Sequence, residues 1–321
     1  MSKDAGSRTE ARPEALVLFS LIERWHGIIE RDFTVRYAAG APDREAYIRE
    51  HGPNVRAAVT NGSTGISAEL ISRLPKLEVI GCFSAGYENV DLAAARARGI
   101  KVSYGPGANS DSVADCAIGL MLAASRDMVR RDRLVRAGRW ADIRALTGSI
   151  TGRRLGIIGY GAAAKAIARR AEAFSMDIAY TKPVPDPASP HRYVAGVKEL
   201  AAQSDFLVVA APGGKATHHM VGREVLEALG PKGWLVNIAR GSLVDTAALL
   251  EALRAGTIAG AALDVYEDEP GVPPELFALE NTVLLPHIAG FTTDAFESGV
   301  KLLVENLRAH FAGQPLVTPL A

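Results

Sequence analysis

The stretch Leu155–Phe174, "LGIIGYGAAAKAIARRAEAF", decides the fold that we predict for this chain. An apolar run typical of a buried strand leads into a glycine-rich turn, Gly159–Ala164, and helix-forming residues follow. The turn has the spacing G-x-G-x-x-G/A, which between a strand and a helix is the pattern of a dinucleotide-binding βαβ unit. Gly159 allows the tight turn, Gly161 lets the backbone approach a pyrophosphate, and the helix N-terminus offers N–H groups to that anion. The stretch therefore predicts a dinucleotide site.

Short apolar runs alternate with helix-like segments on both sides of this turn. The first series reads "EALVLFS", "FTVRYAA", "VRAAVTN", "LEVIGCF" and "IKVSYG"; the second reads "RRLGIIG", "MDIAYT", "SDFLVVA", "GWLVNIA", "IAGAALDVY" and "NTVLLP". Such alternation indicates parallel sheets. We predict the α/β class with two doubly wound parallel-sheet lobes and a cleft between them. Residues 1–108, completed by a C-terminal helix at 291–321, would form a flavodoxin-like substrate domain, and residues 109–290 a Rossmann cofactor domain.

Two longer segments read as helices. Ser112–Ala137 is apolar at first and basic later, and we predict one long helix there, as a crossover between the domains. We expect its arginines to form a solvent-exposed face of the helix, because long charged side chains can keep their charged groups in water. Thr293–Gly313 is amphipathic, and we expect this terminal helix to fold back onto the first domain.

The composition excludes several classes of function. Lys+Arg and Asp+Glu are both 36, and this balance argues against a nucleic-acid partner, which would require a basic face. The chain has no apolar run of membrane-spanning length, and its polar start lacks a secretory signal. Cys82 and Cys116 lie in apolar stretches without metal-ligand spacing, so we expect buried free thiols and no metal. We predict a cytoplasmic protein.

The end of the second strand of the cofactor domain reads "YTKPVP", Tyr180–Pro185. NAD-binding domains usually place an acidic residue here, which bonds the 2′-hydroxyl of the adenosine ribose. Thr181 and Lys182 would instead attract a 2′-phosphate and donate hydrogen bonds to it. The sequence therefore favours NADP(H), with NAD(H) as the alternative.

Three polar residues of this half follow predicted strands. Arg240 comes directly after "GWLVNIA", Glu269 lies just beyond a strand that ends at Asp264, and His287 follows "NTVLLP". The carboxyl ends of parallel strands share one edge of the sheet, so we expect these side chains to converge. The other histidines have no comparable setting in the sequence: His26, His51, His191, His218, His219 and His310.

Each of these residue types suits one part of a hydride transfer to a ketone. The guanidinium of Arg240 can hold a substrate carboxylate or carbonyl oxygen. The imidazole of His287 titrates near neutrality and can protonate the forming alkoxide. The carboxylate of Glu269 can orient that imidazole and favour its charged form.

At these residues the chain resembles the D-isomer-specific 2-hydroxyacid dehydrogenases, in the branch of the glyoxylate/hydroxypyruvate and hydroxyphenylpyruvate reductases. The resemblance runs from about Glu14 to the terminal helix and is carried by "FSAGYENVDL", "GIIGYGAAA", "NIARGSLVD", "LDVYEDEP" and "LLPHIAG". It implies a homodimer formed through the cofactor domains and catalysis by Arg240, Glu269 and His287. Substrate binding is implied for Ser84, Ala85, Gly86 and Arg240. Cofactor contacts are implied for Gly159, Gly161, Ala162, Ala163, Thr181, Lys182, Pro212, Thr217, Ile238, Arg240, Asp264, His287 and Gly290.

The chain also departs from the family pattern. Ala162–Ala164 replace the usual Arg-Ile-Gly, so backbone contacts to the pyrophosphate are retained and an arginine contact is lost. "APGGKATHHMV", Ala211–Val221, replaces the usual Pro-Leu-Thr-Pro-x-Thr loop and retains Pro212 and Thr217.

We predict an NADPH-preferring reductase that converts 2-oxo acids such as glyoxylate or hydroxypyruvate to D-2-hydroxy acids. The hydride would come from the nicotinamide and the proton from His287. One alternative is a formate dehydrogenase, which needs no proton donor and pairs its histidine with a glutamine, so that Glu269 speaks against it. Another is a non-enzymatic, dinucleotide-sensing co-repressor on the same fold, which would need extended regulatory tails.

Overall fold

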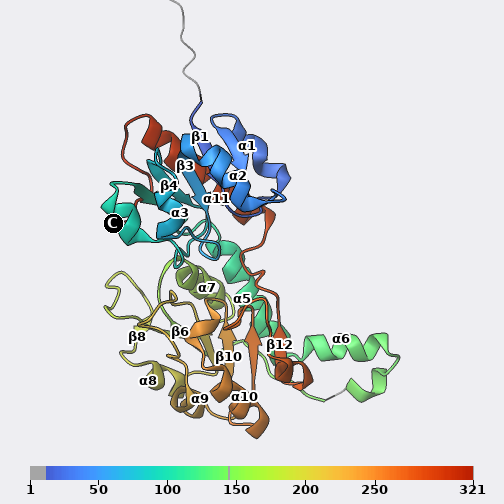
Figure 1. Ribbon diagram of the computed structural model, residues 1–321. Helices are drawn as coiled ribbons and strands as arrows, with labels where there is room; N and C mark the ends of the chain where they lie inside the picture. The colour runs from blue at the N-terminus through green and yellow to red at the C-terminus, as the bar shows by residue number, and fades with distance from the viewer. Residues whose placement is uncertain (1–11, 144, 321) are drawn as a thin grey trace, which may run out of the picture. The chain divides into compact units, whose positions relative to one another are not determined.

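The computed structural model describes residues 12–143 and 145–320 (Figure 1). The chain forms two compact units. Unit 1 contains Met1–Ala108 and Phe296–Ala321, and unit 2 contains Asn109–Ala295. We predicted a boundary at 290/291, and the observed boundary lies at 295/296. It falls within the first turn of the last helix, which begins at Thr293.

Unit 1 is built on a five-stranded sheet in the order β2-β1-β3-β4-β5. All neighbouring strands are parallel. The strands are β1 Glu14–Val17, β2 Thr34–Tyr37, β3 Val55–Thr60, β4 Val79–Cys82 and β5 Lys101–Ser103. This 2-1-3-4-5 order is the flavodoxin-like form of the doubly wound fold, as predicted.

Helices cover both faces of the first sheet. Alternate residues of β1 point to opposite faces: Leu16 packs in one buried cluster, whereas Ala15 and Val17 pack in the other. The second cluster also takes in Val300, Leu303, Val304 and Leu307 of the C-terminal helix. The helices are α1 His26–Glu30, α2 Arg44–His51, α3 Ala68–Ser72, α4 Leu92–Ala97 and α11 Thr293–Phe311, with 3-10 turns η1 Glu23–Trp25 and η2 Gly52–Asn54.

Unit 2 is built on a seven-stranded parallel sheet in the order β12-β11-β10-β9-β6-β7-β8. The strands are β6 Arg154–Ile158, β7 Asp177–Thr181, β8 Arg192–Tyr193, β9 Phe206–Val209, β10 Trp234–Asn237, β11 Gly260–Leu263 and β12 Thr282–Leu284. The chain runs outward from β6 to β8 and then returns to β9 on the other side of β6. This reversal is the Rossmann switch point, where doubly wound folds bind their ligands.

Helices also cover both faces of the second sheet. Leu155 and Ile157 of β6 pack in one buried cluster with α5 and α7, whereas Ile158 packs in another with α8, α9 and α10. The α/β prediction is confirmed by both sheets. The helices are α5 Ser110–Ser125, α6 Met128–Arg136, α7 Ala162–Glu172, α8 Val197–Ala202, α9 Arg223–Leu229 and α10 Thr246–Ala255, with 3-10 turns η3 Trp140–Ile143, η4 Gly241–Leu243 and η5 Pro274–Ala278.

The prediction of one continuous helix over Ser112–Ala137 is wrong. The chain forms α5 and α6, because Asp127 between them adopts a left-handed backbone conformation with φ 52° and ψ 39°. Aspartate is among the few residues that tolerate this region, and it interrupts the helical hydrogen-bond ladder. In Figure 1, α6 and the segment after it extend away from the seven-stranded sheet.

The two cysteines are not paired with each other. Cys82 is buried and Cys116 is half-buried, so the expectation of buried thiols holds fully only for Cys82. Burial, together with the charge of Asp264, raises the pKa of the Cys116 thiol to about 11, so that this thiol is protonated at neutral pH. Among the described residues, none of the helices has the length and apolar character that a membrane crossing requires.

Candidate active site

The glycine turn of unit 2 is formed at the end of β6, next to the switch point. Gly159 has φ +87°, a conformation that L side chains rarely adopt, and a Cβ atom there would lie 2.7 Å from the Cα atom of Ala211. Its N–H donates to the carbonyl of Thr181 at 2.8 Å. Only glycine fits this position without moving the neighbouring strand ends.

The N-terminus of α7 is open to an anion. Gly161 is the exposed N-cap residue, and no side chain caps the first N–H groups of the helix. Ala162 is exposed, whereas Ala164 is fully buried against the sheet. Uncapped N–H groups and the positive end of the helix dipole suit a pyrophosphate. The residues present therefore fit a dinucleotide without the arginine that the family pattern usually supplies.

Thr181 and Lys182, at the end of β7, differ in burial and in the partners of their side chains. Thr181 is 4% exposed, and its hydroxyl donates to the carbonyl of Ala195 at 3.2 Å. Lys182 is half-buried, its carbonyl accepts from the Tyr193 hydroxyl at 3.2 Å, and its ammonium forms no salt bridge with any described residue. Of the predicted pair, Lys182 is thus the residue whose polar group is available to a ligand.

The loop after β9 is held together by Thr217. Its hydroxyl donates to the carbonyl of Pro212 at 2.8 Å and is also within 3.2 Å of the carbonyl of Gly214. Pro212 is exposed. The two residues that the loop shares with the family pattern therefore fix its shape through a contact with each other.

Three neighbouring strands carry the predicted polar residues to one edge of the sheet. β10 pairs with β11, and β11 pairs with β12, so that Asn237, Leu263 and Leu284 lie side by side at their carboxyl ends. Arg240, Asp264 and His287 follow within three residues of these positions. Each of the three strands contributes buried apolar side chains, and Arg240, Asp264 and His287 follow shortly after the strand ends.

His287 and Glu269 form a direct pair. Nδ1 of His287 lies 2.6 Å from Oε2 of Glu269, and the other oxygen of Glu269 accepts from the Tyr266 N–H at 3.0 Å. The imidazole is 39% exposed, and its Nε2 forms no hydrogen bond with a described residue. One ring nitrogen is thus oriented by a carboxylate while the other faces outward, as a proton donor requires.

Asp264 holds the backbone that presents His287. Its carboxylate accepts the N–H groups of Ile288 at 2.7 Å and Ala289 at 2.9 Å, and its carbonyl accepts the N–H of His287 at 2.8 Å. His287 has φ 55°, so these bonds stabilise an unfavourable backbone conformation. Burial raises the pKa of Asp264, against the opposing effect of the two N–H donors.

Two residues that the sequence did not single out shape this edge. The amide of Asn237, 1% exposed, donates to the carbonyl of Arg240 at 2.9 Å and accepts from the N–H of Ala239. The Tyr266 hydroxyl donates to the carbonyl of Leu285 at 2.9 Å and joins the ends of β11 and β12. In the sequence, both residues could have been recognised as polar side chains at or just beyond the end of an apolar run.

Gly241 joins the arginine segment to the glutamate segment. A Cβ atom at Gly241 would lie 1.8 Å from the carbonyl carbon of Tyr266, so the two backbones touch. Arg240 is half-buried, and one of its nitrogens donates to the carbonyl of Ala239 at 2.6 Å. The structure thus brings Arg240, Asp264, Glu269 and His287 to the same edge.

One histidine that the sequence did not distinguish also contacts a carboxylate. Nε2 of His219 lies 2.5 Å from Oε1 of Glu267, and the ring of His218 stacks on that of His219 with centroids 3.9 Å apart. Glu267 also accepts the N–H of Thr246 at 3.2 Å. This second pair ties the 212–219 loop to the segment that carries Glu269. The sequence did not show it, because the loop and that segment are far apart along the chain.

In unit 1, the predicted substrate loop is folded on itself. The Ser84 hydroxyl donates to the carbonyl of Gly86 at 2.7 Å and accepts from the Gly62 N–H at 2.8 Å. The N–H groups of Ala85 and Gly86 have no acceptor among the described residues. They are therefore available to an anionic group such as a carboxylate.

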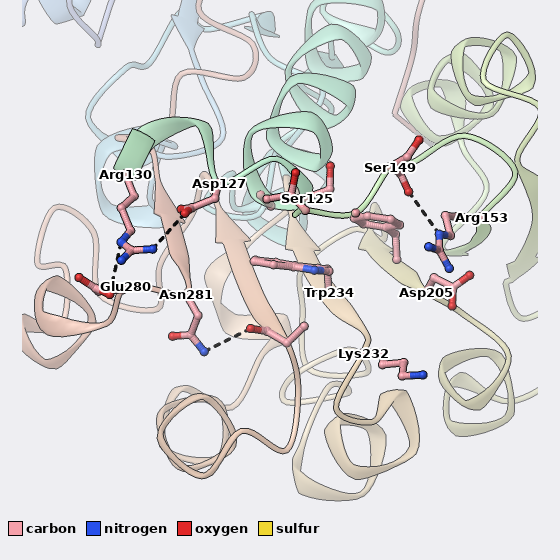
Figure 2. A pocket seen from close by; sticks show the side chains of 15 residues that line it. Ser125, Asp127, Arg130, Ser149, Arg153, Asp205, Lys232, Trp234, Glu280 and Asn281 are labelled. Carbon is pink, nitrogen blue, oxygen red and sulfur yellow. Dashed lines mark hydrogen bonds and ion pairs between the residues drawn. The ribbon is translucent and has the colours of Figure 1, made fainter. Parts of the chain in front are cut away.

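A pocket of about 520 Å³ lies at the other edge of the second sheet (Figure 2). Its lining includes Arg153, Asp205 and Trp234, which stand at the amino ends of β6, β9 and β10. The charged groups drawn in Figure 2 are largely paired, as Arg130 is with Asp127 and Glu280. Doubly wound folds bind ligands at the carboxyl ends, so this pocket is separate from the candidate active site.

Comparison with known proteins agrees with this arrangement. Residues 118–289 match the family model described as D-isomer specific 2-hydroxyacid dehydrogenase, NAD binding domain. The chain is 44% identical to glyoxylate/hydroxypyruvate reductase A of Arabidopsis thaliana over 293 residues, 91% of this chain and 94% of that protein. It is also 44% identical to hydroxyphenylpyruvate reductase of Plectranthus scutellarioides over 304 residues, 94% and 92% of the two chains.

A solved structure is similar over nearly its full length. It is that of the NADPH-dependent glyoxylate/hydroxypyruvate reductase of Sinorhizobium meliloti in complex with NADP and malonate, with a TM-score of 0.87, 37% identity, and 97% of each chain covered. The chain belongs to the D-isomer specific 2-hydroxyacid dehydrogenase family, in the branch of the glyoxylate/hydroxypyruvate reductases. Its cofactor is accordingly a nicotinamide dinucleotide.

Proposed function

We propose that this protein reduces small 2-oxo acids, such as glyoxylate or hydroxypyruvate, to D-2-hydroxy acids and prefers NADPH as the reductant. The observation that carries the proposal is the His287–Glu269 pair, with its 2.6 Å contact, at the carboxyl ends of the strands of a dinucleotide-binding domain. The names of the relatives, glyoxylate/hydroxypyruvate and hydroxyphenylpyruvate reductases, point to the same substrate class.

The chain's own residues suit the roles that this reaction requires. A bound nicotinamide cofactor supplies the hydride. His287 would deliver a proton from Nε2 to the forming alkoxide, while Glu269 holds the opposite nitrogen and favours the charged ring. Arg240 would bind the substrate carboxylate or carbonyl oxygen. In unit 1, the N–H groups of Ala85 and Gly86, which lack a described acceptor, would bind a substrate carboxylate, which makes this unit the proposed substrate domain.

Unit 2 is the proposed cofactor domain. The uncapped N-terminus of α7, with Gly161, Ala162 and Ala163, would hold the pyrophosphate. The other proposed contacts are those that the family resemblance implies: Gly159, Pro212, Thr217, Ile238, Asp264 and Gly290. The preference for NADPH rests on Lys182, which stands where an NAD-binding domain carries an acid. Thr181, whose hydroxyl is already engaged, would contribute less than Lys182.

We further propose that the protein is a cytoplasmic homodimer. Free cysteines fit a reducing compartment. On α6 and in the segment that follows it, apolar side chains stand in solvent: Met128 is 47% exposed, Val135 48%, Trp140 70% and Leu146 102%. A group of exposed apolar residues of this kind marks an interaction surface, and a second copy of the chain is the occupant that the family resemblance implies.

The test is a panel of glyoxylate, hydroxypyruvate, pyruvate and phenylpyruvate, each with NADPH and NADH. We expect turnover of at least one 2-oxo acid, a higher kcat/KM with NADPH than with NADH, and a product of the D configuration. Oxidation of formate would instead favour a formate dehydrogenase. Retained nucleotide binding without any turnover would favour the dinucleotide-sensing co-repressor.

A further inference from the structure

A carboxylate that the proposed function does not use stands beside two lysines at the end of β7. Oδ2 of Asp186 lies 2.6 Å from the ammonium of Lys165, a residue of the second turn of α7. Lys182 stands four positions before Asp186, and its charge also acts on the Asp186 carboxyl. The aspartate thus lies among the cations that a phosphorylated ribose would need.

Asp186 is held in this position by its backbone. Its N–H donates to the Tyr180 hydroxyl at 2.9 Å, and that hydroxyl lies 3.3 Å from the Asp186 carbonyl. The Tyr180 ring is 1% exposed and stacks on Tyr160 of the glycine turn, with centroids 3.9 Å apart. Oδ1 of Asp186 accepts the N–H of Ala188 at 3.0 Å. The carboxylate is therefore fixed to the wall of the dinucleotide turn.

An ordinary surface ion pair explains this geometry less well. Such a pair joins two mobile side chains in water and contributes little. The Asp186 side chain is only 15% exposed, whereas that of Lys165 is 51% exposed. Lys165 also lies over the Tyr160 ring, 5.7 Å from its centroid. The pair is thus built around a fixed anion, with the lysine as the movable partner.

We propose that Asp186 sets the strength of the preference for NADPH by competing with the 2′-phosphate of the cofactor for Lys165, close in the fold to Lys182. This inference rests on the proposed function, because it assumes that the ribose lies at the end of β7. In the absence of cofactor the Asp186 carboxylate is paired with Lys165, and the charge of Lys182 also acts on it. A 2′-phosphate must displace the carboxylate from Lys165, whereas the 2′-hydroxyl of NADH has no charge with which to do so. Asp186 therefore weakens the binding of NADPH specifically, and Lys165 is a second cation that strengthens it.

The experiment measures the dissociation constants of NADPH and NADH, by the fluorescence of the bound nicotinamide, for the wild-type protein and single variants. Asp186→Asn keeps the acceptor for the Ala188 N–H and removes the charge. We expect it to bind NADPH about three- to tenfold more tightly, with NADH changed less than twofold, as suits one partly screened charge. Lys165→Gln should weaken NADPH binding by a similar factor and leave NADH binding nearly unchanged.

The matched control is Asp177→Asn, which makes the same change of charge at the exposed amino end of the same strand. It should change neither affinity. Equal affinities for NADPH in the wild type and Asp186→Asn, or equal shifts for both cofactors, would overturn the inference. A wild-type protein that does not prefer NADPH would refute the proposed cofactor preference instead. A selective gain of NADPH affinity in Asp186→Asn would still support the competition.

Discussion

At the scale of single residues, the site depends on a histidine held in an unfavourable backbone conformation. His287 has φ 55° and would not adopt it without compensation. Asp264 supplies that compensation through the N–H groups that follow the histidine, and Glu269 fixes the ring. A substitution of any of these three residues should therefore lower the rate of the reaction. Loss of His287 removes the imidazole itself, whereas loss of Asp264 or Glu269 disturbs its position.

We predict that His287→Ala lowers kcat for 2-oxo acid reduction by about 10²–10⁴-fold, because the proton donor is lost. Steady-state rates with saturating NADPH measure this. The control His51→Ala removes a histidine of unit 1 that packs on Tyr47, and it should leave kcat unchanged. Turnover in His287→Ala within threefold of the wild-type value would contradict the assignment of the proton donor.

We predict that Asp264→Ala lowers the free energy of unfolding by about 2–4 kcal/mol, because the N–H groups of Ile288 and Ala289 lose their acceptors inside the protein. Asp264→Asn keeps one acceptor oxygen and should lose less. Urea unfolding of the two variants measures the difference. Equal stability of the Ala and Asn variants would show that the two N–H groups do not depend on this carboxylate.

At the scale of elements, one aspartate adds side-chain contacts to the pairing of β6 with β9. Asp205, directly before β9, accepts the N–H of Arg154 at 2.9 Å and its guanidinium at 2.8 Å and 3.2 Å. Arg154 lowers the pKa of Asp205, against the opposing effect of burial. The switch point lies between these two strands, so the pair stabilises the part of the sheet that carries the glycine turn.

We predict that Asp205→Asn lowers the free energy of unfolding by about 1–2 kcal/mol at pH 7, a value reduced because Arg154 is half exposed. A carboxyl whose folded pKa lies below its unfolded pKa stabilises the protein above the unfolded value, and this contribution is lost as the pH falls through the folded value. The difference between wild type and variant should therefore shrink below about pH 4. Urea unfolding from pH 7 to about pH 3 measures it, with Asp294→Asn as control, since Asp294 is exposed and forms no ion pair with a described residue. A difference independent of pH would exclude the ion pair as its cause.

At the scale of the whole molecule, the apolar side chains of α6 are the feature that a single chain leaves unexplained. The helix is rich in charged residues and has no buried residue. Its apolar side chains Met128, Val129 and Val135 are all more than 40% exposed. Apolar side chains that stay exposed to water give such a helix no stabilisation from burial. A partner that covers it would bury these side chains.

We predict that the full chain sediments with twice the mass of one chain, and that Val135→Asp shifts it toward the monomer, because a charge would be buried in the interface. Analytical ultracentrifugation at several concentrations measures this. Glu305→Lys, on the exposed side of α11, is the control and should leave the mass unchanged. A wild-type monomer at all concentrations would exclude the homodimer.

The two sheets, the glycine turn and the candidate catalytic residues could all be predicted from the amino-acid sequence. Buried parallel strands read as apolar runs, and the polar residue that ends each run is visible locally, as with Arg240 and His287. The break at Asp127 was not visible, because the flanking residues have good helix propensity and only the backbone angle of one residue interrupts them. The two-residue strand β8 was too short to give a pattern.

The contacts between polar groups, in contrast, could be seen only in the folded chain. The His219–Glu267 pair, the carboxylate of Asp264 beneath His287, the engaged hydroxyl of Thr181 and the contact of Asp186 with Lys165 all join segments that the sequence keeps apart or leaves without direction. Periodicity reports which side of an element is buried, because burial repeats with the geometry of the helix or strand. A hydrogen bond depends on positions to within a few tenths of an ångström, and packing of the whole domain sets those positions.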